Sequence, residues 1–177
     1  MRWLLLVSLL GLGCGPEPAD VAKNLSSDNP VIREDTAKIA HNFDGPEVRE
    51  ALIHALDDES MMVRYNAIKS LVQLEEAGAV PKLIEMLGKM PKEPSSQIEG
   101  KIQREVIDAL GQLKQPEAVP ALIAYVEANM LPKPPLNAIW ALGFLEDNAS
   151  MELLGQLVEH KDPYVAWNAR KALSKLR

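Results

Sequence analysis

Apolar residues recur along this chain with the spacing of one face of an α-helix. Five segments share the pattern, with mostly apolar side chains four, seven, eight and eleven residues after each start. Residues spaced in this way lie on one side of a helix that has about 3.6 residues per turn. The pattern therefore predicts five amphipathic helices, and the equivalent segments begin at Ile32, Val63, Ile102, Pro134 and Val165.

A second set of helices is predicted between the first five. Leucines recur in the intervening segments, and prolines stand in or near the expected first turns, where a missing N–H group costs little. Residues 19–25 are expected to supply a shortened first member of this set. The chain thus predicts an all-α fold, an α-solenoid of about five antiparallel helix pairs over residues 28–177. The recurring leucines are Leu52, Leu83, Leu122 and Leu153.

The repeat is interrupted once. Successive starts are 31, 39, 32 and 31 residues apart, so the second interval carries about eight extra residues. The surplus falls in a segment rich in Pro, Ser and charged residues. It predicts an inserted loop at 88–100, which we expect to be mobile and without a dedicated role, with a binding loop at one edge of the array as the alternative.

The composition agrees with helices and excludes several kinds of protein. Leu and Ala dominate, aromatic residues make up 5%, and hydrophobic residues make up 47%, which is enough to fill a core. The formal net charge of −6 argues against a nucleic-acid partner. One cysteine and three scattered histidines offer neither an intrachain disulfide nor a metal site, and no catalytic motif occurs. We expect a protein that is not an enzyme and carries no cofactor or metal.

The N-terminus predicts export. Arg2 precedes an apolar run at 3–12, about half of what spans a bilayer, and Gly13 and Cys14 follow it. This order resembles a bacterial lipoprotein signal, which implies a signal peptide at 1–13, a lipid on Cys14, and a tether and partial first helix at 14–27. The resemblance implies a protein anchored in the bacterial envelope that faces the periplasm or the outside. The alternative is ordinary cleavage near Gly13 and a secreted, soluble protein.

The repeats resemble HEAT repeats, in the short variety shared with bilin-lyase-like proteins. The resemblance is carried by Val63-Arg64, by the two Ala-Leu-Gly triplets at 109–111 and 141–143, and by the turn at 162–165. It implies that each helix opening with Val-Arg lies on the inner, concave side. Arg33 and Arg64 match the arginine of the family. The later slots hold Gln103, Pro135 and Ala166, so a stacked arginine ladder is expected to end after the second repeat.

Trp140 is the side chain most in need of explanation. It stands on the expected solvent side of its helix, where the four equivalent positions are charged. Trp167 and Leu136 are expected beside it. One interpretation is a binding patch on the concave surface, and the alternative is that the two tryptophan rings pack on each other and cap the array. The candidate partner-binding residues are Tyr65, Arg104, Leu136, Trp140 and Trp167.

A polar column flanks the apolar stripe. Its side chains are expected to bond to neighbouring helices or loops, with recognition of a polar ligand as the alternative. The members of this column are Asp35, Asn66, Glu105, Asn137 and Asn168.

Two functions remain open from the sequence. The first is a non-catalytic scaffold or interaction module that binds a protein partner on its concave surface. The second, implied by the resemblance, is a lyase or isomerase of the bilin-lyase type that binds or modifies a tetrapyrrole chromophore.

Overall fold

The computed structural model describes residues 15–176, and these residues contain helices and no strands. The predicted signal peptide and Cys14 lie outside the described residues. One set of helices comprises α1 (Pro18–Leu25), α3 (Pro46–His54), α5 (Val80–Lys89), α7 (Ala118–Ala128) and α9 (Met151–Val158). The other set comprises α2 (Pro30–Ile39), α4 (Met61–Gln73), α6 (Gln97–Gln112), α8 (Leu136–Leu145) and α10 (Pro163–Leu173).

Short 3₁₀ turns follow or precede several of these helices. They are η2 (Ala40–Asn42), η3 (Ala55–Asp57), η4 (Ala77–Ala79) and η5 (Asn148–Ser150).

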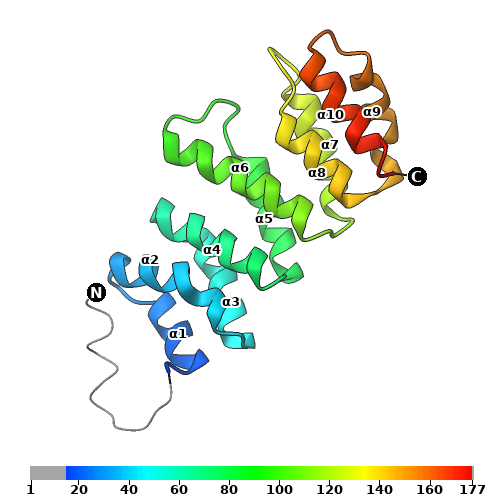
Figure 1. Ribbon diagram of the computed structural model, residues 1–177. Coiled ribbons are helices and arrows are strands. Elements are labelled where there is room, and N and C mark those ends of the chain that lie inside the picture. The colour runs from blue at the N-terminus through cyan, green and yellow to red at the C-terminus, as the bar shows by residue number, and fades with distance from the viewer. Residues whose placement is uncertain (1–14, 177) are drawn as a thin grey trace.

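The helices form two layers (Figure 1). The five even-numbered helices, here called the inner helices, pack each against the next, whereas the odd-numbered outer helices contact one another less extensively. A layer whose members approach more closely lies on the inside of a curved array, so the inner helices lie on the concave side. The predicted α-solenoid of antiparallel helix pairs is confirmed, and α1 is the short first outer helix.

A single hydrophobic core runs between the two layers from Val21 to Leu176. Leucines that recur in the sequence, such as Leu52, Leu83 and Leu122, are fully buried there. Because each helix pair buries its apolar side only against its neighbours, no repeat has a core of its own.

The inserted segment is smaller than the sequence predicts. Helix α5 continues to Lys89 and α6 begins at Gln97, so only residues 90–96 of the expected loop at 88–100 lack helical structure. The Ser96 hydroxyl accepts a hydrogen bond from the Glu99 amide, and the Glu99 carboxylate accepts one from the Ser95 amide at 2.6 Å. This reciprocal capping starts α6 early, so the insertion lengthens the helix.

Glycine allows the C-terminal inner helices to approach closely. A Cβ atom on Gly111 of α6 would lie 2.9 Å from the Ala141 Cα of α8, and one on Gly143 would lie 2.8 Å from the Ala172 Cα of α10. Neither contact is possible for a real Cβ atom. The two Ala-Leu-Gly triplets therefore set the spacing of α6, α8 and α10.

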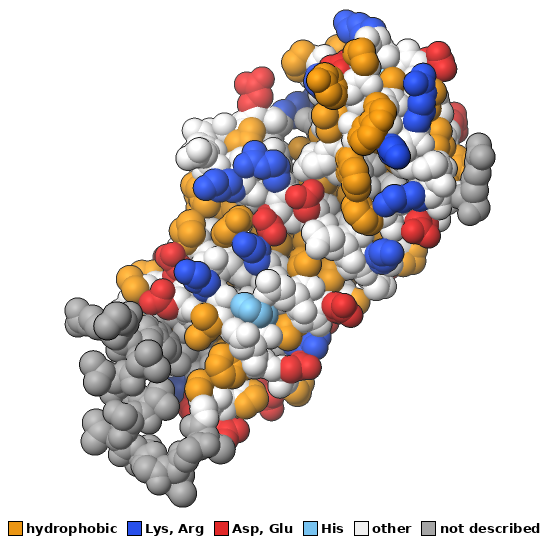
Figure 2. Space-filling model, viewed as in Figure 1, with side chains coloured by type: hydrophobic (Ala, Val, Ile, Leu, Met, Phe, Trp, Pro, Cys, Tyr) orange, Lys and Arg blue, Asp and Glu red, His pale blue; other side chains and the backbone are white. Residues whose placement is uncertain are grey.

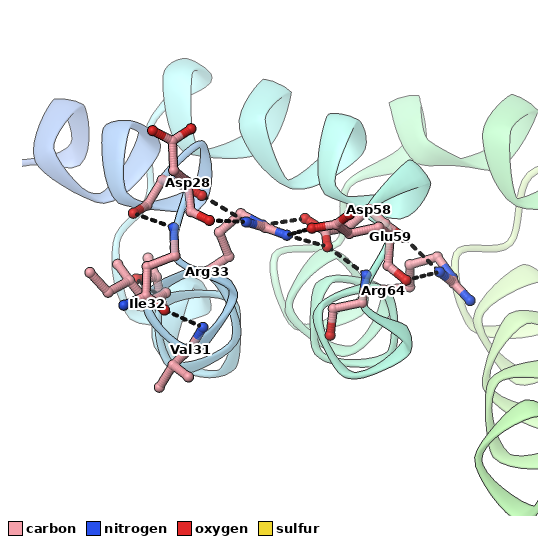
Figure 3. Close-up of polar contacts among 11 residues, drawn as sticks. Asp28, Val31, Ile32, Arg33, Asp58, Glu59 and Arg64 are labelled. Carbon is pink, nitrogen blue, oxygen red and sulfur yellow. Dashed lines mark hydrogen bonds and ion pairs between the residues drawn. The ribbon is translucent and has the colours of Figure 1, made fainter.

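The first two repeats are joined by a buried ion pair (Figure 3). Arg33, whose side chain is 9% exposed, donates to both carboxylate oxygens of Asp58 at 2.6 and 3.0 Å, and to the Ser27 carbonyl at 2.8 Å. It also donates to Glu59 at 3.0 Å. Arg33 therefore connects the loop before its own helix to the loop before α4.

The bond from Arg33 to a carbonyl of the loop before its own helix has counterparts in the next two repeats. Arg64 donates to the Asp58 carbonyl at 2.6 Å, and Gln103 donates to the Pro91 carbonyl at 2.9 Å. The sequence predicts that the arginines end after the second repeat, and Gln103 follows at the third. The arginines stop, but the amide of Gln103 makes an equivalent bond to the preceding loop.

Asp58 is held in its charged form. Burial acts to raise the pKa of the Asp58 carboxyl, but hydrogen bonds from Arg33 and the Ser60 amide, together with the charge of Arg64, outweigh it. The pKa therefore lies below the ordinary value of 3.8. The ion pair should contribute to stability wherever Asp58 is ionised.

Replacing Gly111 with alanine should destabilise the array. Alanine favours helices, but its Cβ would collide with the α8 backbone, so Gly111→Ala is expected to lower the free energy of unfolding by about 1–3 kcal/mol. Gly155→Ala in α9 is the matched control, since its Cβ would meet nothing within 4 Å. Urea denaturation measures both, and equal stability of the two variants would contradict the close approach.

Asp58→Asn should destabilise the protein in a way that depends on pH. At neutral pH the loss of a charged acceptor is expected to cost about 1–3 kcal/mol. Because the folded-state pKa is depressed, this contribution is present above the ordinary pKa of 3.8 and is lost as the pH falls through the lower folded-state value. Urea denaturation over a pH series should show the difference from wild type shrinking in acid.

The exposed Asp35 supplies the control for this experiment. Asp35→Asn removes the same charge from a side chain that forms no ion pair among residues 15–176. It should leave stability nearly unchanged at every pH. A difference between Asp58→Asn and wild type that persists in acid would rule out the charge of Asp58 as its source.

Candidate functional site

Two tryptophans lie exposed on the concave side of the C-terminal repeats. Trp140 of α8 is 42% exposed and Trp167 of α10 is 53% exposed. The ring that pairs with Trp140 is that of Phe144, one helical turn later, with centroids 5.4 Å apart and planes tilted by 40°. Among the described residues the two tryptophans do not pair, so the interpretation in which they cap the array by packing on each other is wrong.

Lysines cover part of these rings. The Lys175 ammonium lies 5.3 Å from the Trp140 centroid and 3.9 Å from that of Phe144, and the Lys171 ammonium lies 5.6 Å from the Trp167 centroid. Figure 2 shows a run of hydrophobic side chains over the C-terminal helices, flanked by Lys and Arg. The faces of aromatic rings carry partial negative charge, so they attract these ammonium groups.

A groove lies between α6 and α8 beside Trp140. Its volume is about 440 Å³, and most of its exposed lining is apolar. Ala141, the residue that approaches Gly111 closely, forms part of its lining, so the close helix contact borders the groove. The remaining lining residues are Asp108, Gln112, Asn137, Trp140 and Phe144.

Carboxylates on α6 face a partly apolar environment. Partial burial raises the pKa of Asp108, and the nearby charge of Arg104 opposes this. Burial also raises the pKa of Glu105, against the charge of Lys69, and Asp108 adds to the rise. Glu105 is half-buried, whereas Asp108 is exposed at the groove.

The other candidate residues have separate places. Arg104 is exposed and lines a second groove of about 260 Å³, which shares Asn137 with the first. Tyr65 is half-buried beneath the Lys69 ammonium, 5.4 Å from its ring centroid, and Leu136 packs against the core. The structure thus brings Trp140 and Arg104 to neighbouring grooves and leaves Tyr65 and Leu136 largely in packing roles.

Arg33 and Arg64 are occupied by loop carbonyls and, for Arg33, by carboxylates. Neither contributes to the grooves beside Trp140.

Sequence analysis missed Phe144 and Asp108 as members of the site. Phe144 follows Trp140 by four residues, a spacing that places both on one helix face, and this signal could have found it. Asp108 occupies the same repeat position as Trp140 one repeat earlier, and successive inner helices bring such positions together.

Residues 15–176 contain neither a candidate metal site nor a helix that could span a membrane. No group of three or more His, Cys, Asp or Glu side chains there is arranged to hold a metal ion. In the same range, every helix is too short or too polar to cross a bilayer.

Comparison with known families identifies the repeats. Residues 19–97 match the model for HEAT repeats, and residues 102–128 match the model for the PBS lyase HEAT-like repeat. Comparison with curated protein sequences finds no match.

Solved structures share the fold. A chain from the complex of CpcE and CpcF of phycocyanin lyase from Nostoc sp. PCC7120 is 24% identical with a TM-score of 0.70, over 96% of this chain and 68% of that one. A designed armadillo repeat protein in complex with the peptide (KR)4 is 19% identical with a TM-score of 0.58, over 89% and 80%. An engineered protein is 18% identical with a TM-score of 0.61, over 90% and 78%.

These identities establish the architecture alone. They show that this chain is an α-solenoid, in which residues 19–97 are similar to HEAT repeats and residues 102–128 are similar to the PBS lyase HEAT-like repeat.

Proposed function

We propose that this protein is a non-catalytic interaction module that binds a protein partner on the concave face of its C-terminal repeats. The observation that carries the proposal is the groove between α6 and α8, which is walled by the exposed Trp140 and by Phe144. A large, rigid ring in an apolar groove is the kind of anchor that dominates protein interfaces.

Similarity to other repeat proteins supports a partner of this kind. The designed armadillo repeat protein was solved with a bound peptide, and the phycocyanin lyase chain was solved in a complex. Both share the stacked-helix fold, whose concave side offers a long surface made from equivalent positions of successive repeats.

We further propose that the module is exported and tethered to the bacterial envelope through a lipid on Cys14. The support is the sequence of the N-terminal segment, an apolar run followed by Gly13 and Cys14. Two or more acyl chains would suffice for stable anchoring. The polar residues after Cys14 would then separate the solenoid from the membrane surface.

Binding of a tetrapyrrole, with or without lyase activity, is the second candidate. It is favoured by the match of residues 102–128 to the PBS lyase HEAT-like repeat. That segment supplies Asp108 and Gln112 to the groove, while Trp140 and Phe144 come from the next repeat. The leader-like N-terminus favours the exported interaction module over this alternative, which implies a cytoplasmic protein.

Trp140→Ala should weaken partner binding while leaving the fold intact. Removal of an anchor ring is expected to reduce affinity about tenfold or more, whereas an exposed side chain contributes little to the core. Cross-linking and pull-down from intact envelopes with the full-length protein would capture the partner, and binding of the purified partner would give the ratio of affinities.

Tyr164→Ala is the control for this variant. It removes a ring that is 71% exposed and lies outside the groove, so it should bind the partner like wild type. Thermal unfolding of each variant separates binding from stability. A large fall in the melting temperature of Trp140→Ala would mean that the ring stabilises the repeat, and normal binding by this variant would refute its role as an anchor.

Cys14→Ser should abolish acylation. If Cys14 carries the anchor, metabolic labelling with a fatty acid is expected to mark the wild-type protein and not the variant, because serine offers no thiol for the diacylglyceryl group. Fractionation should move the variant out of the detergent-soluble membrane fraction. Labelling of the variant, or equal membrane recovery of both proteins, would contradict a lipid at this position.

A further inference from the structure

We propose that the groove between α6 and α8 takes a lysine or arginine side chain from an extended segment of the partner. The cationic head would pair with Asp108, and the aliphatic stem would lie along Trp140 and Phe144. This inference rests on the proposed function and specifies the chemistry of the partner.

Asp108 is a carboxylate without a cationic partner. None of the ion pairs within residues 15–176 includes it. Arg104, one turn earlier on α6, is near enough to affect its pKa, but does not form an ion pair with it. The Asp108 side chain is exposed at the groove, so a cation brought into the groove can reach its carboxylate directly.

The aromatic wall suits the rest of such a side chain. Trp140 and Phe144 line the same groove as Asp108, and Asp108 is the only charged residue in its lining. The ammonium of Lys175 lies over both rings, which shows that their faces accept a cation in this setting. A side chain with an apolar stem and a positive head therefore matches both surfaces of the groove.

Asn137 supplies an independent sign of a missing ligand. Its equivalents in the polar column have acceptors: the Asn66 amide donates to the Glu34 carbonyl at 3.5 Å, and the Asn168 amide donates to the Tyr164 carbonyl at 2.7 Å. The Asn137 amide nitrogen is buried and has no partner among the described residues.

An unsatisfied buried donor is costly, and Asn137 lines both the Trp140 groove and the Arg104 groove. A main-chain carbonyl of a segment crossing between the two grooves would satisfy it. Asn137 and Asp108 line the same groove, so a peptide that contains Lys or Arg can offer a carbonyl acceptor to Asn137 and a cation to Asp108.

A charged peptide and its neutral isostere test the proposal. The probes are a short fluorescein-labelled peptide of alternating Arg and Ala and the same peptide with citrulline at each Arg. Fluorescence anisotropy with the full-length protein should show binding of the Arg peptide and about tenfold weaker binding of the citrulline peptide. Asp108→Asn should weaken binding of the Arg peptide by a similar factor, and the Asn137 side-chain amide signal should shift on titration.

Glu152→Gln is the matched control, because it removes one negative charge from an exposed side chain of α9 that is not part of the groove lining. It should bind the Arg peptide like wild type. Equal weakening by Glu152→Gln and Asp108→Asn would mean general charge attraction and would overturn the inference, as would equal binding of the two peptides.

The experiments distinguish failure of this inference from failure of the proposed function. If Trp140→Ala abolishes capture of the natural partner but neither peptide binds, the groove is a binding site that takes another kind of side chain, and the inference is overturned alone. If both peptides fail and Trp140→Ala captures the partner normally, both proposals fail.

Discussion

The spacing between neighbouring inner helices is the constraint on which the rest of the structure depends. Each helix pair has apolar surface that only the next pair can cover, so the distance between repeats decides how well the core is filled. In the C-terminal half Gly111 and Gly143 bring backbones into contact with Ala141 and Ala172. That approach also shapes the surface, because Ala141 forms part of the groove beside Trp140.

The closest contacts between inner helices differ in kind along the array. Polar contacts join the N-terminal repeats: Arg33 bridges to Asp58, and the Ser70 hydroxyl donates to the Ala37 carbonyl at 2.6 Å. Close packing of small residues joins the C-terminal inner helices. Both halves share the hydrophobic core, and an ion pair between Lys133 and Asp162 at 2.8 Å also joins the loops before α8 and α10. Ionisation therefore adds to stability chiefly at the contact between α2 and α4, and side-chain volume limits the contacts of α6, α8 and α10. The groove lies in the half where the helix spacing is fixed by sterics, which favours a preformed shape.

Periodicity made the fold predictable because burial repeats with the helices. Leucines such as Leu52 and Leu122 face the same interface in each repeat, so their spacing located the helix pairs. Local capping was harder to anticipate: Ser96 and Glu99 extend α6 into a segment whose Pro and Ser content suggested a loop. The unsatisfied state of Asn137 could not be predicted, since it depends on the acceptors that neighbouring helices happen to offer.

A repeat protein turns a column of equivalent positions into a continuous strip of surface. Asp108 and Trp140 hold the same position in successive repeats and therefore line one groove, although 32 residues separate them. Where successive repeats carry the same kind of charged residue at this position, as at Lys38 and Lys69, the side chains are exposed to solvent. A change from carboxylate to aromatic ring between adjacent repeats creates a boundary that a side chain with two unlike ends can recognise. In such an array, a partner can be recognised specifically where the residue type at an equivalent position changes from one repeat to the next.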